Sequence, residues 1–78
     1  MPTILRSGQY RFYFYSSDRN EPHHIHVQRE RAVAKFWLDP VQLEHSKGYR
    51  LSELRRIQRI IEHEKQNLED GWNEFFGQ

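Results

Sequence analysis

The chain contains no cysteine among its 78 residues. This absence excludes disulfide bonds, zinc sites built on thiolates and cysteine nucleophiles. Any metal site would therefore have to use histidine and carboxylate ligands. Residues 1–15 also lack a long apolar run, a basic segment and a small-residue cleavage site, so we expect no signal peptide. We expect a cytoplasmic protein that does not enter a membrane.

Net charge and apolar content are also low. Twelve Lys and Arg residues nearly balance eleven Asp and Glu residues, and the net charge of +1 does not by itself indicate a nucleic-acid partner. Hydrophobic residues make up only 36% of the chain, whereas aromatic residues reach 14%, so large rings must supply much of the core. A chain of this length predicts a single domain over residues 1–78, and we expect no cofactor.

Residues 3–6 and 10–15 are predicted to form a β-hairpin, because Ser7-Gly8-Gln9 separates two β-rich stretches. In the second stretch, successive side chains alternate between the two faces of the strand. One face carries Tyr10, Phe12 and Phe14, and the other carries Arg11, Tyr13 and Tyr15. The turn-rich segment 16–22 follows and is predicted to be a loop.

Residues 24–28 and 32–38 predict a second pair of strands. Ile25 and Val27 share one face of the first strand, and the second strand offers Ala34, Phe36 and Leu38 to the same side. A two-residue turn at 30–31 would place His26 opposite Lys35 and His24 opposite Trp37. Because Glu30 and Arg31 are poor turn residues, a longer loop is the alternative.

The C-terminal part predicts one long helix over about residues 52–76, with Ser52 as its N-cap. Its apolar stripe consists of Leu54, Ile57, Ile61, Leu68, Trp72 and Phe75. Residues 38–41 are expected to end the sheet, and residues 41–49 to hold at most one helical turn. The predicted fold is therefore α+β, with a small antiparallel sheet of three to four strands within about 3–39 and one long C-terminal helix on one face.

One helix can cover only one face of such a sheet, so the other face should be open. That face would display Arg11, Tyr13, Tyr15, His24, His26, Lys35 and Trp37. Aromatic rings and cations on one surface can stack unpaired bases and bind phosphates, as small sheets do with single-stranded RNA. An ordinary polar sheet face and a homodimer interface are the alternatives.

His24, His26 and Lys35 are the candidate catalytic residues. Metal-free RNA cleavage needs a base, an acid and a cation at the reacting phosphate, and two histidines with a lysine offer all three. Solvated strand residues without a catalytic role are the alternative. Two histidines at i and i+2 could instead bind a metal with Glu21, or with Asp18, His23 or His45, as the third ligand. Because Lys35 would disfavour a divalent cation, we expect no metal.

Arg55, Arg56 and Arg59 lie near the start of the predicted helix, and acidic residues fill its later part. This arrangement opposes the helix dipole, so helix stability does not explain it. The three arginines are therefore predicted to contact RNA or an acidic partner, with a solvated charge run as the alternative.

Several segments resemble domain-of-unknown-function family 4160 of prokaryotes. They are "MPTILR", "YRFYFYS", "NEPHHIHV", "AKFWLDPV", "ELRRIQRIIEHE" and "WNEFFG", in order along nearly the whole chain. The resemblance implies that one hallmark of the family is formed by Glu21, Pro22, His24, His26 and Val27. It implies further hallmarks at Lys35, Trp37, Asp39-Pro40 and Trp72-Asn73-Glu74.

The resemblance also implies a genetic context. Members of the family look like one half of two-gene pairs, often beside a small protein of domain-of-unknown-function family 2442, in an arrangement similar to toxin–antitoxin systems. We therefore expect the toxin component of such a pair, acting on RNA as a possible metal-independent ribonuclease, with the neighbouring small protein as its partner. A non-catalytic protein-binding module and a histidine-based metal-binding protein are the alternatives.

Overall fold

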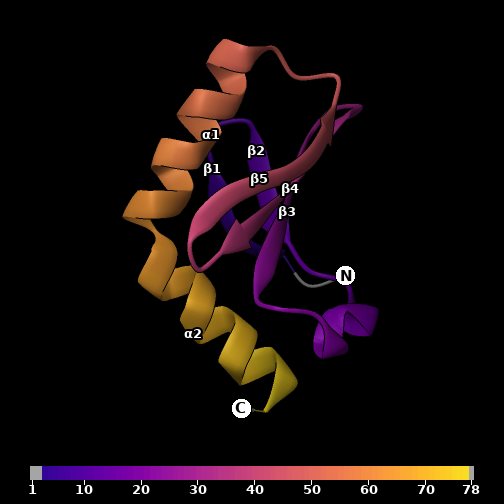
Figure 1. Cartoon of the computed structure of the whole chain (residues 1–78), viewed down its shortest axis with the longest axis vertical. Coiled ribbons are helices and arrows are strands. Elements are labelled where there is room, and N and C mark those ends of the chain that lie inside the picture. The colour runs from indigo at the N-terminus through magenta and orange to yellow at the C-terminus, as the bar shows by residue number, and fades with distance from the viewer. Residues whose placement is uncertain (1–2, 78) are drawn as a thin grey trace.

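The computed structural model of the chain describes residues 3–77, which form a five-stranded antiparallel sheet followed by two helices (Figure 1). The strands lie in the sheet in chain order, so every strand pairs with its sequence neighbour. In chain order the elements are β1 (Thr3–Ser7), β2 (Tyr10–Tyr13), the 3-10 helix η1 (Ser16–Asn20), β3 (His24–Arg29), β4 (Ala32–Leu38), β5 (Val41–Lys47), α1 (Leu51–His63) and α2 (Lys65–Phe76).

The register of β3 and β4 confirms the pairing predicted from the alternation. His26 lies opposite Lys35, and His24 lies opposite Trp37. The two strands are joined by the two-residue turn at 30–31, in which Glu30 adopts a left-handed conformation with φ 56°. This turn forms without glycine or asparagine because the apolar alternation on both strands fixes the register.

β5 was not predicted, and the expectation that the sheet ends near residue 39 is wrong. Residues 41–47 form an edge strand in which only Val41 is even partly buried. A strand exposed on both faces has no apolar alternation, which is the signal used to recognise strands in sequence. The Asp39-Pro40 turn brings this segment back beside β4, and backbone pairing holds it there.

The predicted single helix is divided into α1 and α2 at Glu64, whose φ and ψ are −99° and 12°. A straight helix over 26 residues would be about 39 Å long, whereas the longest dimension of the protein is 34 Å. The interruption lets α1 follow the sheet and α2 turn toward its end, along one side of the strands (Figure 1). Neither helix within residues 3–77 is long and apolar enough to cross a membrane.

The core lies between the helices and one face of the sheet, as predicted. Its completely buried side chains include Phe12, Phe14, Ile25, Val27, Phe36, Leu38, Ile57, Ile61, Leu68 and Trp72. One position of the predicted stripe is wrong: Phe76 is buried, whereas Phe75 is 42% exposed. The interruption at Glu64 shifts the contact face of α2, so Leu68, Trp72 and Phe76 follow one another at intervals of four residues.

α2 approaches β1 closely at Gly71. A Cβ atom at this position would lie 2.7 Å from Cγ2 of Ile4, which is too close for an unshifted contact. Gly71 therefore stays inside the helix despite its low helix propensity, because it lets the helix lie against the strand. It does not mark the bend, which lies seven residues earlier at Glu64.

An ion pair fixes the start of α1 to the sheet. Glu53 accepts two hydrogen bonds from the Arg29 guanidinium, both of 2.9 Å, and a third of 3.1 Å from the Tyr10 hydroxyl. The bond from Arg29 is the main cause that lowers the pKa of Glu53 below its ordinary value of 4.5. This contact connects residues far apart in sequence and orients the helix on the sheet.

Glu53→Gln should lower the thermal midpoint at neutral pH, because the charge-assisted bonds to Arg29 are weakened. Since the pKa of Glu53 is lowered in the folded state, its stabilisation is present above pH 4.5 and is lost as the pH falls through the folded-state pKa. Thermal unfolding of both proteins from pH 7 to pH 3 should show the two midpoints converging at the acid end. A difference that stays constant with pH would contradict this account.

Candidate functional site

The candidate site lies on the sheet face opposite the core, at the end where β3 begins. Side chains at alternate positions of β3 and β4 point to this face, among them His24, His26, Lys35 and Trp37. α1 packs against the other face, whereas α2 passes the end of the sheet, where Trp72 contacts His24. η1 and the loop that follows it cover part of the face opposite the core, which makes that face less open than predicted.

Asp18, in η1, is the centre of the cluster. Its Oδ2 atom lies 3.0 Å from Nε2 of His24 and 3.0 Å from Nε2 of His26, and it accepts a 2.8 Å hydrogen bond from the backbone N–H of Tyr15. Burial raises the pKa of the Asp18 carboxyl, but the Tyr15 N–H and the two imidazoles outweigh burial and lower it overall. Asp18 is 5% exposed, so the cluster is closed on that side.

His24 is completely buried, which corrects the prediction that it lies on an open surface. Its ring packs edge-on against Trp37 and Trp72, with ring centroids 5.7 and 5.2 Å away. Its Nδ1 lies 2.8 Å from the carbonyl oxygen of Pro22, which can only accept a hydrogen bond, so Nδ1 carries a proton. His24 shares the predicted face with His26 but lies beneath the surface.

His26 reaches the surface, with 15% of its side chain exposed. Nε2 donates a hydrogen bond to Asp18, and the ring is stacked on Tyr13 with centroids 5.4 Å apart. Burial lowers the pKa of His26 below its ordinary value of 6.5, and this effect exceeds the opposing attraction of Asp18. His26 is therefore a mostly neutral, well-oriented imidazole at the edge of the cluster.

Lys35 lies beside His26 but is not a free cation. Its Nζ atom donates a 2.6 Å hydrogen bond to Glu21, and it lies 4.7 Å from the ring centroid of Trp37. Only 13% of the Lys35 side chain is exposed, compared with 44% for that of Glu21. The hydrogen bond from Lys35 is the main cause that lowers the pKa of Glu21. A phosphate could contact Lys35 only by displacing this carboxylate.

Arg11 and Tyr13 of β2 form a row of planar groups with Tyr15, which follows the strand. The Arg11 guanidinium lies 4.3 Å from the ring centroid of Tyr13, whose ring in turn stacks on His26. Tyr15 is 40% exposed, whereas Tyr13 is buried rather than displayed. Burial also raises the pKa of Tyr13 to about 12. Tyr15 is thus the ring of this row that a ligand could reach.

Among residues 3–77, Asp18, His24 and His26 form a group that could hold a metal ion, because one ligand atom from each lies within 4.8 Å of the others. In the sequence, Asp18 is only one of several candidate third ligands, and Glu21 is the one preferred there. The structure instead pairs Glu21 with Lys35. The turn-rich composition of residues 16–22 gives no sign that a 3-10 helix points Asp18 back at β3.

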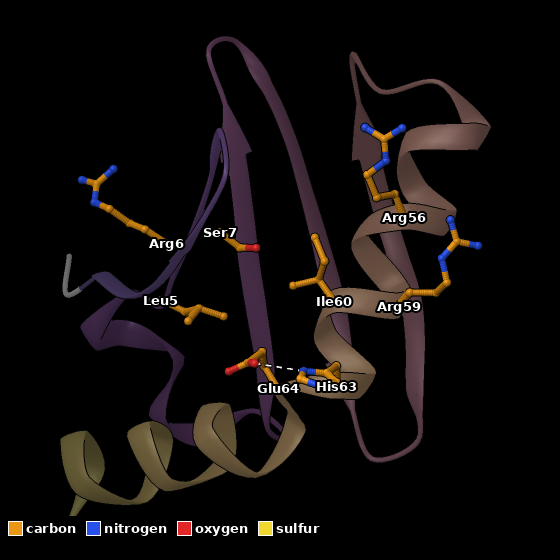
Figure 2. A pocket seen from close by; sticks show the side chains of 8 residues that line it. All are labelled: Leu5, Arg6, Ser7, Arg56, Arg59, Ile60, His63 and Glu64. Carbon is orange, nitrogen blue, oxygen red and sulfur yellow. Dashed lines mark hydrogen bonds and ion pairs between the residues drawn. The ribbon is translucent and has the colours of Figure 1, made fainter.

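A second candidate surface is a groove between β1 and α1 (Figure 2). It has a volume of about 400 Å³, and it is lined by Leu5, Arg6, Ser7, Arg56, Arg59, Ile60, His63 and Glu64. Figure 2 shows Arg6 on one wall and Arg56 and Arg59 on the other, with Leu5 and Ile60 between them. Of the three arginines predicted on the helix, Arg55 is exposed but does not line the groove.

The comparison with family models matches residues 9–73 to the domain of unknown function DUF4160. The chain belongs to this family. The matched segment contains η1, the histidine cluster and both arginines of α1 that line the groove, but not Arg6. No match to the chain was found among curated proteins or among solved structures.

Proposed function

We propose that this DUF4160 protein is the toxin component of a prokaryotic two-gene pair and that it cleaves RNA. The observation that carries the proposal is the cross-strand pair of His26 and Lys35 on the sheet face opposite the core. A partly exposed imidazole and an ammonium group side by side suit a phosphodiester, whose charge the ammonium group can neutralise.

Neighbouring features support RNA as the substrate. The exposed ring of Tyr15 lies against His26 at a centroid distance of 4.8 Å, where an unpaired base could stack on it. Trp37 lines a cavity of about 500 Å³ together with Pro22, His23 and Pro40, which is large enough for a nucleobase. The groove containing Arg6, Arg56 and Arg59 adds a cationic surface for the sugar–phosphate backbone.

The burial of His24 changes the division of roles within the proposed site. A completely buried ring cannot contact RNA, so His24 acts as a positioning residue and not as the acid or base of the reaction. His26 and Lys35 are left as the residues that contact the reacting phosphate. Glu21 must give up its bond to Lys35 when RNA binds, which favours a polyanion over a neutral ligand.

A non-catalytic protein-binding module is the second candidate function. β5 favours it, because this edge strand is exposed on both faces and carries Leu43 at 37% exposure. Edge strands offer unpaired backbone groups to an added strand. The neighbouring small protein expected for the pair could bind there, whether or not the chain also cleaves RNA.

Expression of the wild-type chain alone should arrest bacterial growth and shorten cellular RNA within minutes. Co-expression of the small protein encoded beside it should restore growth. The measurements are growth curves, RNA sequencing of new 5′ ends, and cleavage of single-stranded RNA by the purified protein. Normal growth together with intact RNA would contradict the enzymatic proposal and leave the binding module.

A further inference from the structure

We propose that Asp18, His24 and His26 form a binding site for one divalent transition-metal ion. The ligand atoms would be Oδ2 of Asp18 and Nε2 of both histidines. This inference deepens the proposed function by assigning a metal to its site, but it rests on the geometry of the cluster alone. It can therefore be tested without any RNA substrate.

The unpartnered ring nitrogen of His24 is the first reason. Its Nδ1–H donates to the Pro22 carbonyl, so in the neutral ring Nε2 carries a lone pair. This buried Nε2 has no hydrogen-bond partner, although Oδ2 of Asp18 lies only 3.0 Å away. A metal ion bound beside Asp18 would give this buried nitrogen a partner and would use the lone pair in coordination.

The distances are the second reason. Ligand atoms bound to one ion at about 2.1 Å lie roughly 3.0–3.4 Å from each other in tetrahedral or octahedral geometry. Asp18 Oδ2 lies 3.0 Å from each of the two histidine nitrogens, and all three ligand atoms fall within 4.8 Å of one another. Small movements of the three side chains would therefore let all three ligand atoms bind one ion.

The surroundings of the cluster are the third reason. A metal-bound histidine usually donates its other ring nitrogen to a carbonyl or carboxylate, as His24 does to Pro22. The nearest lysine in the cross-strand register, Lys35, is neutralised by its 2.6 Å bond to Glu21, so it opposes a cation less than the sequence suggests. Asp18 supplies the negative charge beside the two histidines.

The chemistry of the ligands selects the ion. Two imidazoles and one carboxylate suit zinc, iron(II), cobalt or nickel, whereas magnesium and calcium prefer sites made of oxygen atoms. Three protein ligands leave at least one position open, and this is the arrangement of catalytic rather than structural metal sites. In the proposed site, the ion would be bound by His26, whose side chain reaches the surface, and by His24, whose side chain does not.

The test is direct metal binding by the purified full chain. Equilibrium dialysis with elemental analysis should find one Zn²⁺ per chain, and Co²⁺ should give visible absorption bands of nitrogen and oxygen ligands. Zn²⁺ should also raise the thermal midpoint by mass action, whereas Mg²⁺ at the same concentration should not. Asp18→Asn and His26→Gln should each weaken Zn²⁺ binding by at least about tenfold.

Asp18→Asn is the most informative variant, because the asparagine oxygen can still accept the Tyr15 N–H while the charged ligand is lost. His45→Gln is the matched control, since 62% of the His45 side chain is exposed and it lies outside the cluster. Equal weakening by this control, or no zinc bound by the folded wild type, would overturn the metal site. A wild type that binds zinc but leaves RNA intact would retain the metal site and overturn only the proposed cleavage.

Discussion

His26→Gln should abolish RNA cleavage and growth arrest while the protein remains folded. His26 is the histidine of the cluster that a substrate can reach, and its function is lost whether the imidazole accepts a proton or holds the proposed metal ion. One positioned acid or base contributes about 10²–10⁴-fold in rate. We therefore expect cleavage of single-stranded RNA to slow by at least about 100-fold in a timed assay.

Glutamine is a better replacement than alanine because His26 is more enclosed than its strand position suggests. Its Nε2 atom donates to Asp18, and its ring lies between Tyr13 and Tyr15. Alanine would remove a hydrogen bond to a charged group, at a cost of about 1.5–3 kcal/mol. A glutamine amide can still donate to the carboxylate, so the thermal midpoint should change less than with alanine.

His45→Gln provides the control for this substitution. His45 lies opposite Lys35 on β5, and its side chain is largely exposed, so the same chemical change is made next to the site but outside it. This variant should cleave RNA and arrest growth like the wild type. Full activity of His26→Gln would remove His26 from the site, and equal loss in both variants would indicate a general effect on this face.

The pairing of the central strands could be predicted because alternation leaves few choices. Apolar residues at 25, 27, 34, 36 and 38 must share one face, and only a register that pairs His26 with Lys35 also permits the shortest turn. The same pattern places both histidines away from the core. It does not say what covers the second face, so the burial of His24 by neighbouring rings could not be read from the strand.

Features without periodicity could not be predicted in the same way. β5 is held by backbone pairing and is exposed on both faces, so its side chains carry no pattern. Asp18 reaches the histidines through η1, a single short helix whose direction depends on tertiary contacts. The interruption at Glu64 has no proline or glycine to mark it in the sequence. In each case no periodic pattern inside the segment indicates its local structure.

Replacing Arg6, Arg56 and Arg59 together with glutamine should weaken RNA binding by about 100-fold in 0.1 M salt. Each arginine that neutralises a phosphate of single-stranded RNA releases counterions, and three contacts make the slope of log affinity against log salt steeper by about 2. All three side chains are exposed and line one groove, so the folded core is not altered. The measurement is fluorescence anisotropy with labelled RNA between 0.05 and about 0.5 M salt.

The arrangement of these arginines favours an extended chain of phosphates over a single anion. The guanidinium groups stand on opposite walls and do not converge on one point (Figure 2). Nδ1 of His63 lies 3.1 Å from Glu64 within the same groove, so this carboxylate already has a hydrogen-bond partner there. Inorganic phosphate should consequently bind far more weakly than an RNA of eight or more nucleotides, which the same anisotropy assay can measure by competition.

A second triple variant separates the groove from the total charge. Arg31, Arg50 and Arg55 are also exposed, and none of them lines the groove, so replacing them with glutamine lowers the net charge by the same three units. This control should reduce affinity less than the groove variant does and should leave more of the salt slope, because its three arginines do not line the groove in which the phosphates would bind. Equal losses in the two triple variants would show that RNA is attracted by overall charge and would remove the groove from the interface.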